Sequence, residues 1–141
     1  MKTPGYLNLM KKVKPMKLTN FELDVMQIVW QSDRDLSTRE IYDEIAKKRQ
    51  VVYNTVKTII DRLEEKGALE RTDRKAGRAL VFRAAVTRKS LSEHWVPEYI
   101  ERFFCGSPSA LFSHLLSGKQ ISDQELSKIK ELLEEYEQTP K

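Results

Sequence analysis

The sequence predicts a mainly α-helical fold with a small β wing of two or three strands, and three observations support this prediction. Apolar residues recur every three to four positions along several segments, which is the spacing of one helix face. Ser or Thr stands before most of these segments, as an N-cap does. Between residues 68 and 83, two short apolar runs flank a basic loop, a pattern typical of paired strands.

The composition is that of a soluble globular protein. Hydrophobic residues make up 40% of the 141 positions and charged residues 33%, which argues against a disordered chain. The single cysteine, Cys105, excludes an intramolecular disulfide framework and a metal site built from several thiolates. No apolar run approaches the length of a membrane span, and no signal-peptide core follows the N-terminal lysines. We therefore expect a cytoplasmic protein with no membrane association.

The first 17 residues differ from the rest of the chain. They contain five lysines and no acidic residue, so the remainder of a chain of net charge +4 is close to neutral. Pro4, Gly5 and Pro15 interrupt the segment, and it shows neither a helical nor a strand period. We expect residues 1–17 to form a flexible basic arm.

Two capping boxes predict the first two helices. In Thr19-Asn20-Phe21-Glu22 the hydroxyl can accept from the backbone of Glu22, whose side chain can reach back to Thr19. Apolar residues then recur at helical spacing to Trp30. Ser37-Thr38-Arg39-Glu40 repeats the box before a second helix, and residues 47–52 form the turn into a third.

The third helix and the segment after it have the order of a winged helix-turn-helix. The apolar stripe of this helix, residues 52–67, ends at Lys66-Gly67, where Gly suits a left-handed cap. Residues 68–71 and 80–83 then read as two short strands. The loop between them, residues 72–79, carries three cations and one Gly. Helix, strand, basic loop and strand in this order predict a DNA-binding domain over residues 18–86.

The polar front of the third helix and the basic loop supply the candidate DNA contacts. Short hydrogen-bonding side chains and one cation at a helix front can read base edges in a major groove. These candidates are Asn54, Thr55, Lys57 and Thr58. The loop cations Arg74, Lys75 and Arg78 are the candidate phosphate contacts. Two alternatives remain open: an ordinary amphipathic helix beside an exposed hairpin, or a winged-helix protein–protein adaptor that binds no DNA.

Beyond Val86 the pattern contains helices only. Thr87 or Ser90 can cap a segment in which Pro97 predicts a kink or a restart. Ser107-Pro108 is an N-cap followed by Pro at the first helical position, and Ser122-Asp123-Gln124-Glu125 is another capping box. We expect helices over residues 87–137 and a frayed tail at 138–141.

The last third carries more large apolar side chains than two or three short helices can cover. An exposed apolar surface of that size usually marks an interface, and a twofold homodimer would bury it in a shared core. The expected interface residues are Trp95, Tyr99, Phe103, Phe112, Leu115 and Leu116. The alternative is that these helices fold back on the N-terminal domain.

Residues 18–136 resemble the penicillinase-repressor family, the BlaI/MecI/CopY group of bacterial winged-helix repressors. The likeness is carried by residues 18–26 with Trp30, by Thr55-Val56-Lys57-Thr58 with Arg62-Leu63 and Lys66-Gly67, and by residues 126–133. The resemblance implies a dimeric repressor that occupies a palindromic operator in the promoter of a resistance or homeostasis operon. It places the DNA-reading residues at Asn54, Thr55, Lys57 and Thr58, and wing contacts around Arg74, Lys75 and Arg78.

The chain departs from the family pattern at three places. Val52 stands where a serine is expected to cap the third helix. Cys105 alone does not supply the C-terminal cysteine pair of the copper-responsive members. In β-lactam-responsive members a membrane protease cuts an Asn-Phe bond in the dimerisation domain. The matching position here is His114-Leu115, so the resemblance does not imply regulation by that protease.

Enzymatic activity is not expected. Cys105, His94 and His114 are the only residues that suggest a nucleophile and base, and Cys105 lies between Phe104 and Gly106, as a packing cysteine would. The sequence has no glycine-rich phosphate loop, HExxH or GxSxG motif. We expect no catalytic residues, no metal and no cofactor.

Overall fold

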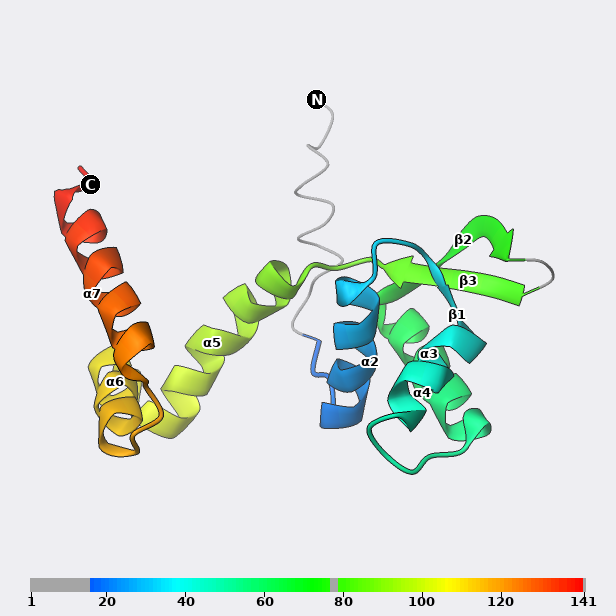
Figure 1. The fold of residues 1–141 in the computed structure, drawn as a ribbon, viewed down its shortest axis with the longest axis horizontal. Helices are drawn as coiled ribbons and strands as arrows, with labels where there is room; N and C mark the ends of the chain where they lie inside the picture. Colours follow the sequence, from blue (N-terminus) through cyan, green and yellow to red (C-terminus); the bar gives the residue numbers. More distant parts are fainter. Residues whose placement is uncertain (1–15, 77–78, 141) are drawn as a thin grey trace. The chain divides into compact units, whose positions relative to one another are not determined.

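The computed structural model describes residues 16–76 and 79–140, which divide into two compact units between Trp95 and Val96 (Figure 1). The helices and strands follow in the order α2 (Asn20–Gln31), β1 (Leu36–Ser37), α3 (Thr38–Ala46), α4 (Tyr53–Lys66), β2 (Leu69–Ala76), β3 (Ala79–Ala84), α5 (Arg88–Phe104), α6 (Pro108–Ser117) and α7 (Asp123–Gln138). The mainly helical fold with a small antiparallel sheet is confirmed.

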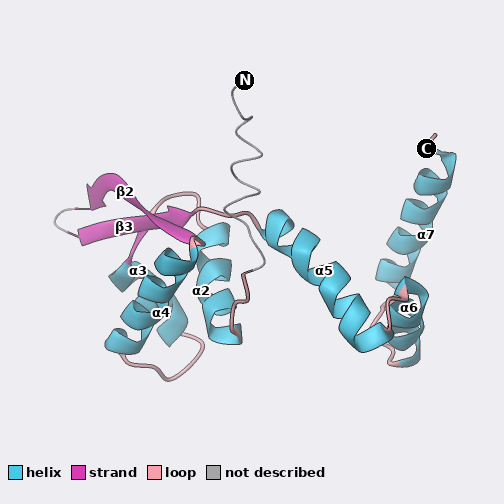
Figure 2. Ribbon diagram, turned by 180° about the vertical axis from the view of Figure 1, so that it is seen from behind, coloured by secondary structure: helices cyan, strands magenta, loops and turns pink. Residues whose placement is uncertain are grey.

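The first unit is a winged helix built on one apolar core. Its three helices α2, α3 and α4 pack against one another and against a sheet of strand order β1-β3-β2 (Figure 2). Met26, Ile41, Ile60 and Leu63, from all three helices, are almost fully buried. Each such side chain contributes roughly 1.5–3 kcal/mol relative to exposure, so this core fixes the orientation of α4.

Local capping explains where the helices begin. Thr19 and Glu22 exchange hydrogen bonds of 2.8 and 3.1 Å, and Ser37 and Glu40 exchange bonds of 3.0 and 3.1 Å. Two of the three predicted capping boxes are therefore confirmed. At Ser122 only half of the box forms, because its hydroxyl accepts from the backbone of Glu125 at 3.1 Å without a return bond from the Glu125 side chain. The α4 helix begins without a side-chain cap after Val52, whose carbonyl accepts instead from the backbone.

The wing has longer strands than the sequence predicts. Strand β2 continues to Ala76, so the expectation of a loop beginning at residue 72 is wrong. The stretch has no strand period, but Lys75 and Ala76 pair with Leu80 and Ala79 of β3, and the register shifts between Arg71 and Lys75. Strand β1 consists of two residues, and Leu36 lies opposite Phe82 of β3.

The packed unit begins before Leu18. Met16 is buried in the apolar core, and its carbonyl accepts a 2.9 Å hydrogen bond from the indole of Trp95. The next carbonyl, that of Lys17, accepts a 2.8 Å bond from Lys66. The last two residues of the predicted arm therefore contact the first unit, and residues 1–15 lie outside the described residues.

Helix α5 begins in the first unit and continues into the second. Thr87 and Ser90 exchange hydrogen bonds of 3.0 and 3.1 Å at its start, which caps the helix. Leu91 is buried in the core of the first unit, and Trp95 is half-buried against it. The helix runs through Pro97 without interruption, so the predicted restart is wrong.

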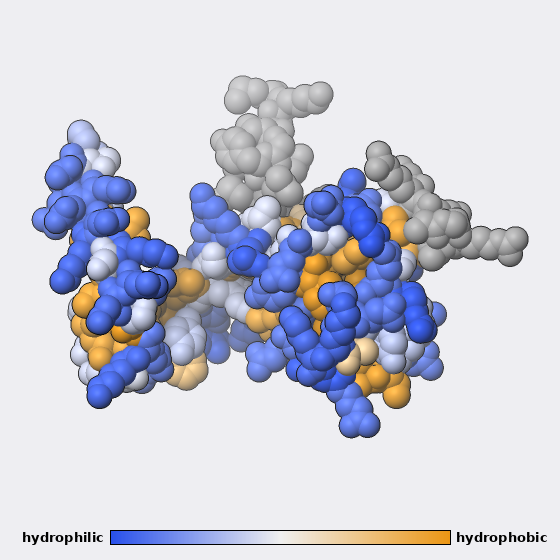
Figure 3. Space-filling model, viewed as in Figure 1, coloured by the Kyte–Doolittle hydropathy of each residue, from blue (hydrophilic) through white to orange (hydrophobic). Residues whose placement is uncertain are grey.

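The second unit contains the end of α5 with α6 and α7. Ser107 caps α6 and Pro108 follows it at the first helical position, which confirms the prediction. None of the large apolar side chains of α6 and α7 is buried within the chain, and Figure 3 shows apolar side chains among the polar ones at the surface of this unit. Across residues 16–76 and 79–140, no helix is long and apolar enough to cross a membrane.

Candidate nucleic-acid interface

Helix α4 has one buried side and one open side. Its apolar stripe of Val56, Ile59, Ile60 and Leu63 lies in the core of the first unit. All four predicted base-reading residues, Asn54, Thr55, Lys57 and Thr58, are exposed on the other side. The helix therefore presents a row of polar side chains on a rigid support.

The far end of α4 is held by ion pairs. Lys66 lies 2.8 Å from the carboxylate of Glu22, whose side chain is 1% exposed, and Arg71 lies 2.8 Å from Glu64. Burial alone would raise the pKa of Glu22, but hydrogen bonds from Lys66 and Thr19 outweigh it and hold this pKa below its ordinary value. Glu22 is consequently ionised near neutral pH and ties α4 to α2.

Lys57 differs from the other predicted base readers because it lines a hollow of about 210 Å³. The hollow lies between the start of α3, the side of α4 and the wing strands. Its lining residues are Ser37, Thr38, Arg39, Tyr53, Lys57, Asp61, Arg71, Leu80 and Phe82. Asn54, Thr55 and Thr58 do not take part, and the hydroxyl of Thr58 donates to the carbonyl of Asn54 at 3.0 Å.

Only the backbone of two of the three predicted wing residues is described. The backbone of Arg74 and Lys75 belongs to β2, and Lys75 is opposite Leu80 of β3. The side chains of Arg74 and Lys75, and the whole of Arg78, lie outside what the structure describes. Their phosphate contacts remain predictions.

Sequence reasoning missed part of the open surface. Arg39 and Arg71 lie beside Lys57 although they are 18 and 14 positions away in the chain, and Asp61 lies one turn further along α4. The capping box at Ser37 marks the start of α3, which could have drawn attention to Arg39. Nothing in the sequence places Arg71 near α4, because that contact depends on how the strands fold back.

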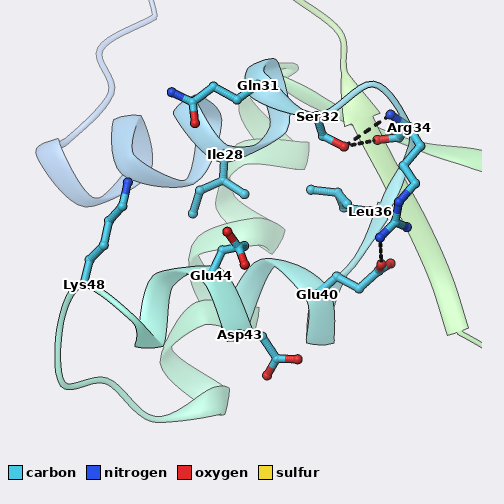
Figure 4. Close-up of a pocket in the computed structure, with 9 residues that line it drawn as sticks. All are labelled: Ile28, Gln31, Ser32, Arg34, Leu36, Glu40, Asp43, Glu44 and Lys48. Atoms are coloured by element: carbon cyan, nitrogen blue, oxygen red, sulfur yellow. Dashed lines mark hydrogen bonds and ion pairs between the residues drawn. The ribbon is translucent and has the colours of Figure 1, made fainter.

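A second, larger hollow of about 440 Å³ lies between α2 and α3 (Figure 4). Ile28 and Leu36 form its apolar part, and Arg34 forms an ion pair with Glu40 at its rim. The hydrogen bond from Arg34, with that from Ser37, lowers the pKa of Glu40. This carboxylate already caps α3 and pairs with Arg34, so its role is structural and we assign no ligand to this hollow.

The residues considered for catalysis do not form a recognisable site. Cys105 is exposed in a left-handed turn after α5, so the expectation that it packs as a buried cysteine is wrong. His94 is exposed on α5, and His114 contacts the ring of Phe104. Within the described part of the chain, no three His, Cys, Asp or Glu side chains are placed to hold a metal ion.

Four of the predicted interface residues are strongly exposed in the single chain. The exposed fractions are 51% for Tyr99, 68% for Phe103, 45% for Phe112 and 55% for Leu116. Leu115 is half-buried, and Trp95 is half-buried through its packing in the first unit. Sequence reasoning missed three further exposed apolar residues of α7, which are Leu132, Leu133 and Tyr136.

Comparison with known proteins assigns the chain to a family. The model of the penicillinase repressor family matches residues 18–135. The penicillinase repressor of Bacillus licheniformis is 27% identical over 132 residues, which cover 94% of this chain and 99% of that protein. The methicillin resistance regulatory protein MecI of Staphylococcus aureus (strain N315) is 22% identical over 120 residues, or 85% of this chain and 95% of that protein. The solution structure of the DNA-binding domain of the repressor BlaI matches with a TM-score of 0.48 and 28% identity, over 55% of this chain and 90% of that one. The match to the family model covers most of the sequence, and the chain therefore belongs to the penicillinase repressor family.

Proposed function

We propose that this chain is a DNA-binding transcriptional repressor that acts as a homodimer on a palindromic operator. The observation that carries the proposal is the open polar side of α4, supported by a buried apolar side, in a chain that belongs to a repressor family. Two relatives are named as penicillinase repressors, from Bacillus licheniformis and Staphylococcus aureus.

The front of α4 is suited to read base edges. Asn54 and Thr55 lie in its first turn, where the helix has its positive dipole end, and Thr58 follows one turn later. An Asn side chain can make two hydrogen bonds with adenine, and Thr can hydrogen-bond a base or contact the methyl group of thymine. These three exposed side chains can therefore supply sequence preference once α4 enters a major groove.

The wing supplies affinity without sequence preference. Its cations Arg74, Lys75 and Arg78 lie within five positions of one another in the sequence. Lysine and arginine that neutralise backbone phosphates release condensed counterions, which gives affinity for any duplex. The wing therefore adds to the binding energy while α4 selects the site.

The second unit supplies the dimer contact. It exposes aromatic and aliphatic side chains from α5, α6 and α7, and none of the residues of α6 and α7 is buried in the single chain. Contiguous exposed apolar surface is costly in water and usually marks an interface. A second copy of the chain offers the same surface, so a twofold dimer can bury both at once.

Dimerisation and DNA binding fit one mechanism. A twofold dimer carries two α4 helices, which match two half-sites about one helical turn, or a small multiple of it, apart. A dimer seated on such a site in a promoter represses transcription by excluding RNA polymerase.

Selection and transcription experiments together test this function. A pool of random duplexes incubated with the full chain should become enriched in one twofold-symmetric motif. A promoter carrying that motif should then give less transcript in vitro as the protein is added, whereas a promoter with a scrambled motif should not. Absence of any enriched motif would favour the winged-helix adaptor that binds protein alone. An enriched motif whose occupation leaves transcript levels unchanged would retain DNA binding and reject repression by exclusion.

A further inference from the structure

The hollow beside α4 brings charged side chains from three separate elements together. Arg39 comes from α3, Lys57 and Asp61 from α4, and Arg71 from β2. Three cations and one carboxylate leave the lining net positive. Such a lining favours an anion, and its position between α4 and the wing is where the backbone of a duplex would pass when α4 lies in the groove.

The three cations differ in how firmly the protein already holds them. Arg71 lies 2.8 Å from Glu64 and packs over the ring of Phe82. Arg39 lies 5.4 Å from the centre of the Tyr42 ring and 3.3 Å from Asp43, but the side chains of this ion pair are more than half exposed, so the pair is weak and can be exchanged for another anion. Lys57 takes part in none of the ion pairs found between described residues. The hollow therefore offers one unpaired ammonium and one exchangeable guanidinium.

We infer that this hollow seats a backbone phosphate of the bound duplex, held by Lys57 and Arg39. The inference rests on the proposed function, and it changes the role that the sequence predicts for Lys57. Lys57 is then a sequence-independent anchor, whereas Asn54, Thr55 and Thr58, which do not line the hollow, carry the base preference. The first helix of a helix-turn-helix crosses the DNA backbone in the same way that the start of α3 would do here.

The salt dependence of binding separates a phosphate anchor from a base reader. Affinities of the full chain and of the variants Lys57→Ala and Arg39→Ala are measured for the selected duplex and a scrambled duplex over a range of salt concentrations. For each variant the slope of log K against log salt should become less negative by about 1.8, because the dimer loses one phosphate contact, worth about 0.9, in each of its two subunits. This corresponds to about a thirtyfold loss of affinity near 0.15 M salt, on both duplexes alike. A Lys57→Ala variant that loses affinity only for the selected duplex would overturn the inference, because that is the signature of base reading.

The matched control is Lys89→Ala, which removes one exposed cation of the same unit outside the hollow. It should leave the slope and both affinities unchanged. If Lys89→Ala and Lys57→Ala lost equal affinity, the loss would follow from net charge alone, and the proposed phosphate site in the hollow would be rejected.

Neutral phosphates locate the seat on the DNA. A series of selected duplexes, each with one methylphosphonate in place of a phosphate, should show losses at the positions held by the wing and at one further position per half-site, where the wild-type chain loses about fivefold in affinity. The methylphosphonate at that position should not weaken binding of Lys57→Ala further, since this variant lacks the ammonium that contacts the phosphate. Additive losses at every position would overturn the inference while leaving specific DNA binding intact. If instead the wild-type chain does not distinguish the selected duplex from the scrambled one, the proposed function itself fails.

Discussion

At the scale of single residues, the buried carboxylate of Glu22 joins α4 to the rest of the first unit. It caps α2 through Thr19 and pairs with Lys66 at the end of α4, while Lys66 also donates to Lys17. One side chain thus connects the start of the packed chain, α2 and α4. Loss of this carboxylate should lower stability without changing base preference, because the residues predicted to read bases lie at the opposite end of α4.

The first prediction concerns Glu22→Gln. The free energy of unfolding at neutral pH should fall by about 1–3 kcal/mol, because Lys66 loses its buried anion. The folded pKa of Glu22 lies below the ordinary value of 4.5, so its contribution is complete above that pH and is lost as the pH falls through the folded pKa. Urea titrations from about pH 7 to about pH 3 should therefore show the two proteins converging in acid. A constant difference across this range would contradict the role of the ionised carboxylate.

The second prediction concerns Asn54→Ala. Because the side chain is exposed and makes no core contact, the variant should fold normally. Its affinity for the selected duplex should fall by about 1–3 kcal/mol, with relaxed preference at particular base pairs. Fluorescence anisotropy on selected and scrambled duplexes measures both effects. Equal weakening on the two duplexes would assign Asn54 to the backbone instead of the bases.

At the scale of elements, the sequence predicts helices better than the contacts between distant segments. Thr19, Ser37 and Ser107 begin their helices as expected, since capping depends on residues within one turn. Residues 72–75 are polar, as is typical of a turn, and β2 continues to Ala76 because Lys75 and Ala76 pair with β3 beyond a register shift. The hydrogen bond from Trp95 to the carbonyl of Met16 joins residues 79 positions apart, and no local sequence pattern predicts it.

The same limits apply to the candidate site. Asn54, Thr55 and Thr58 could be identified because helical spacing separates them from the apolar stripe of α4. Spacing along α4 could not show that Lys57 alone of the four faces a hollow, because the walls of that hollow come from α3 and the wing. The sequence could not assign the exposed apolar residues of α7 to an interface, because their spacing also fits the buried side of an ordinary amphipathic helix.

The third prediction concerns α5, whose first two turns belong to the first unit. Leu91 is buried there and Trp95 packs beside it, so a chain ending at Val86 lacks part of its core. A chain of residues 1–96 should exceed one of residues 1–86 in free energy of unfolding by about 2–5 kcal/mol, as for loss of a buried Leu. The Leu91→Ala variant of residues 1–96 should fall between them, and urea titration compares all three. Equal stability of the two shortened chains would show that α5 is not part of the domain.

At the scale of the whole molecule, the exposed apolar surface of the second unit should be covered by a second copy. Sedimentation should find the full chain dimeric at micromolar concentration. Phe103→Asp and Leu116→Asp should shift it towards monomer, because each places a charge in an apolar interface. Ser127→Asp is the matched control, since Ser127 lies with Glu131 and Glu134 on the polar side of α7. A full chain that stays monomeric at this concentration would contradict the homodimer.

The central claim is that this chain selects a DNA sequence through α4, and a ratio of two affinities tests it most directly. The full chain is titrated against the selected duplex and a scrambled duplex of the same composition, at one salt concentration near 0.15 M. Specific repressors prefer their sites by roughly 10³-fold or more under such conditions, and we expect a ratio in that range. A ratio close to one, with both duplexes bound equally or not at all, would contradict the account.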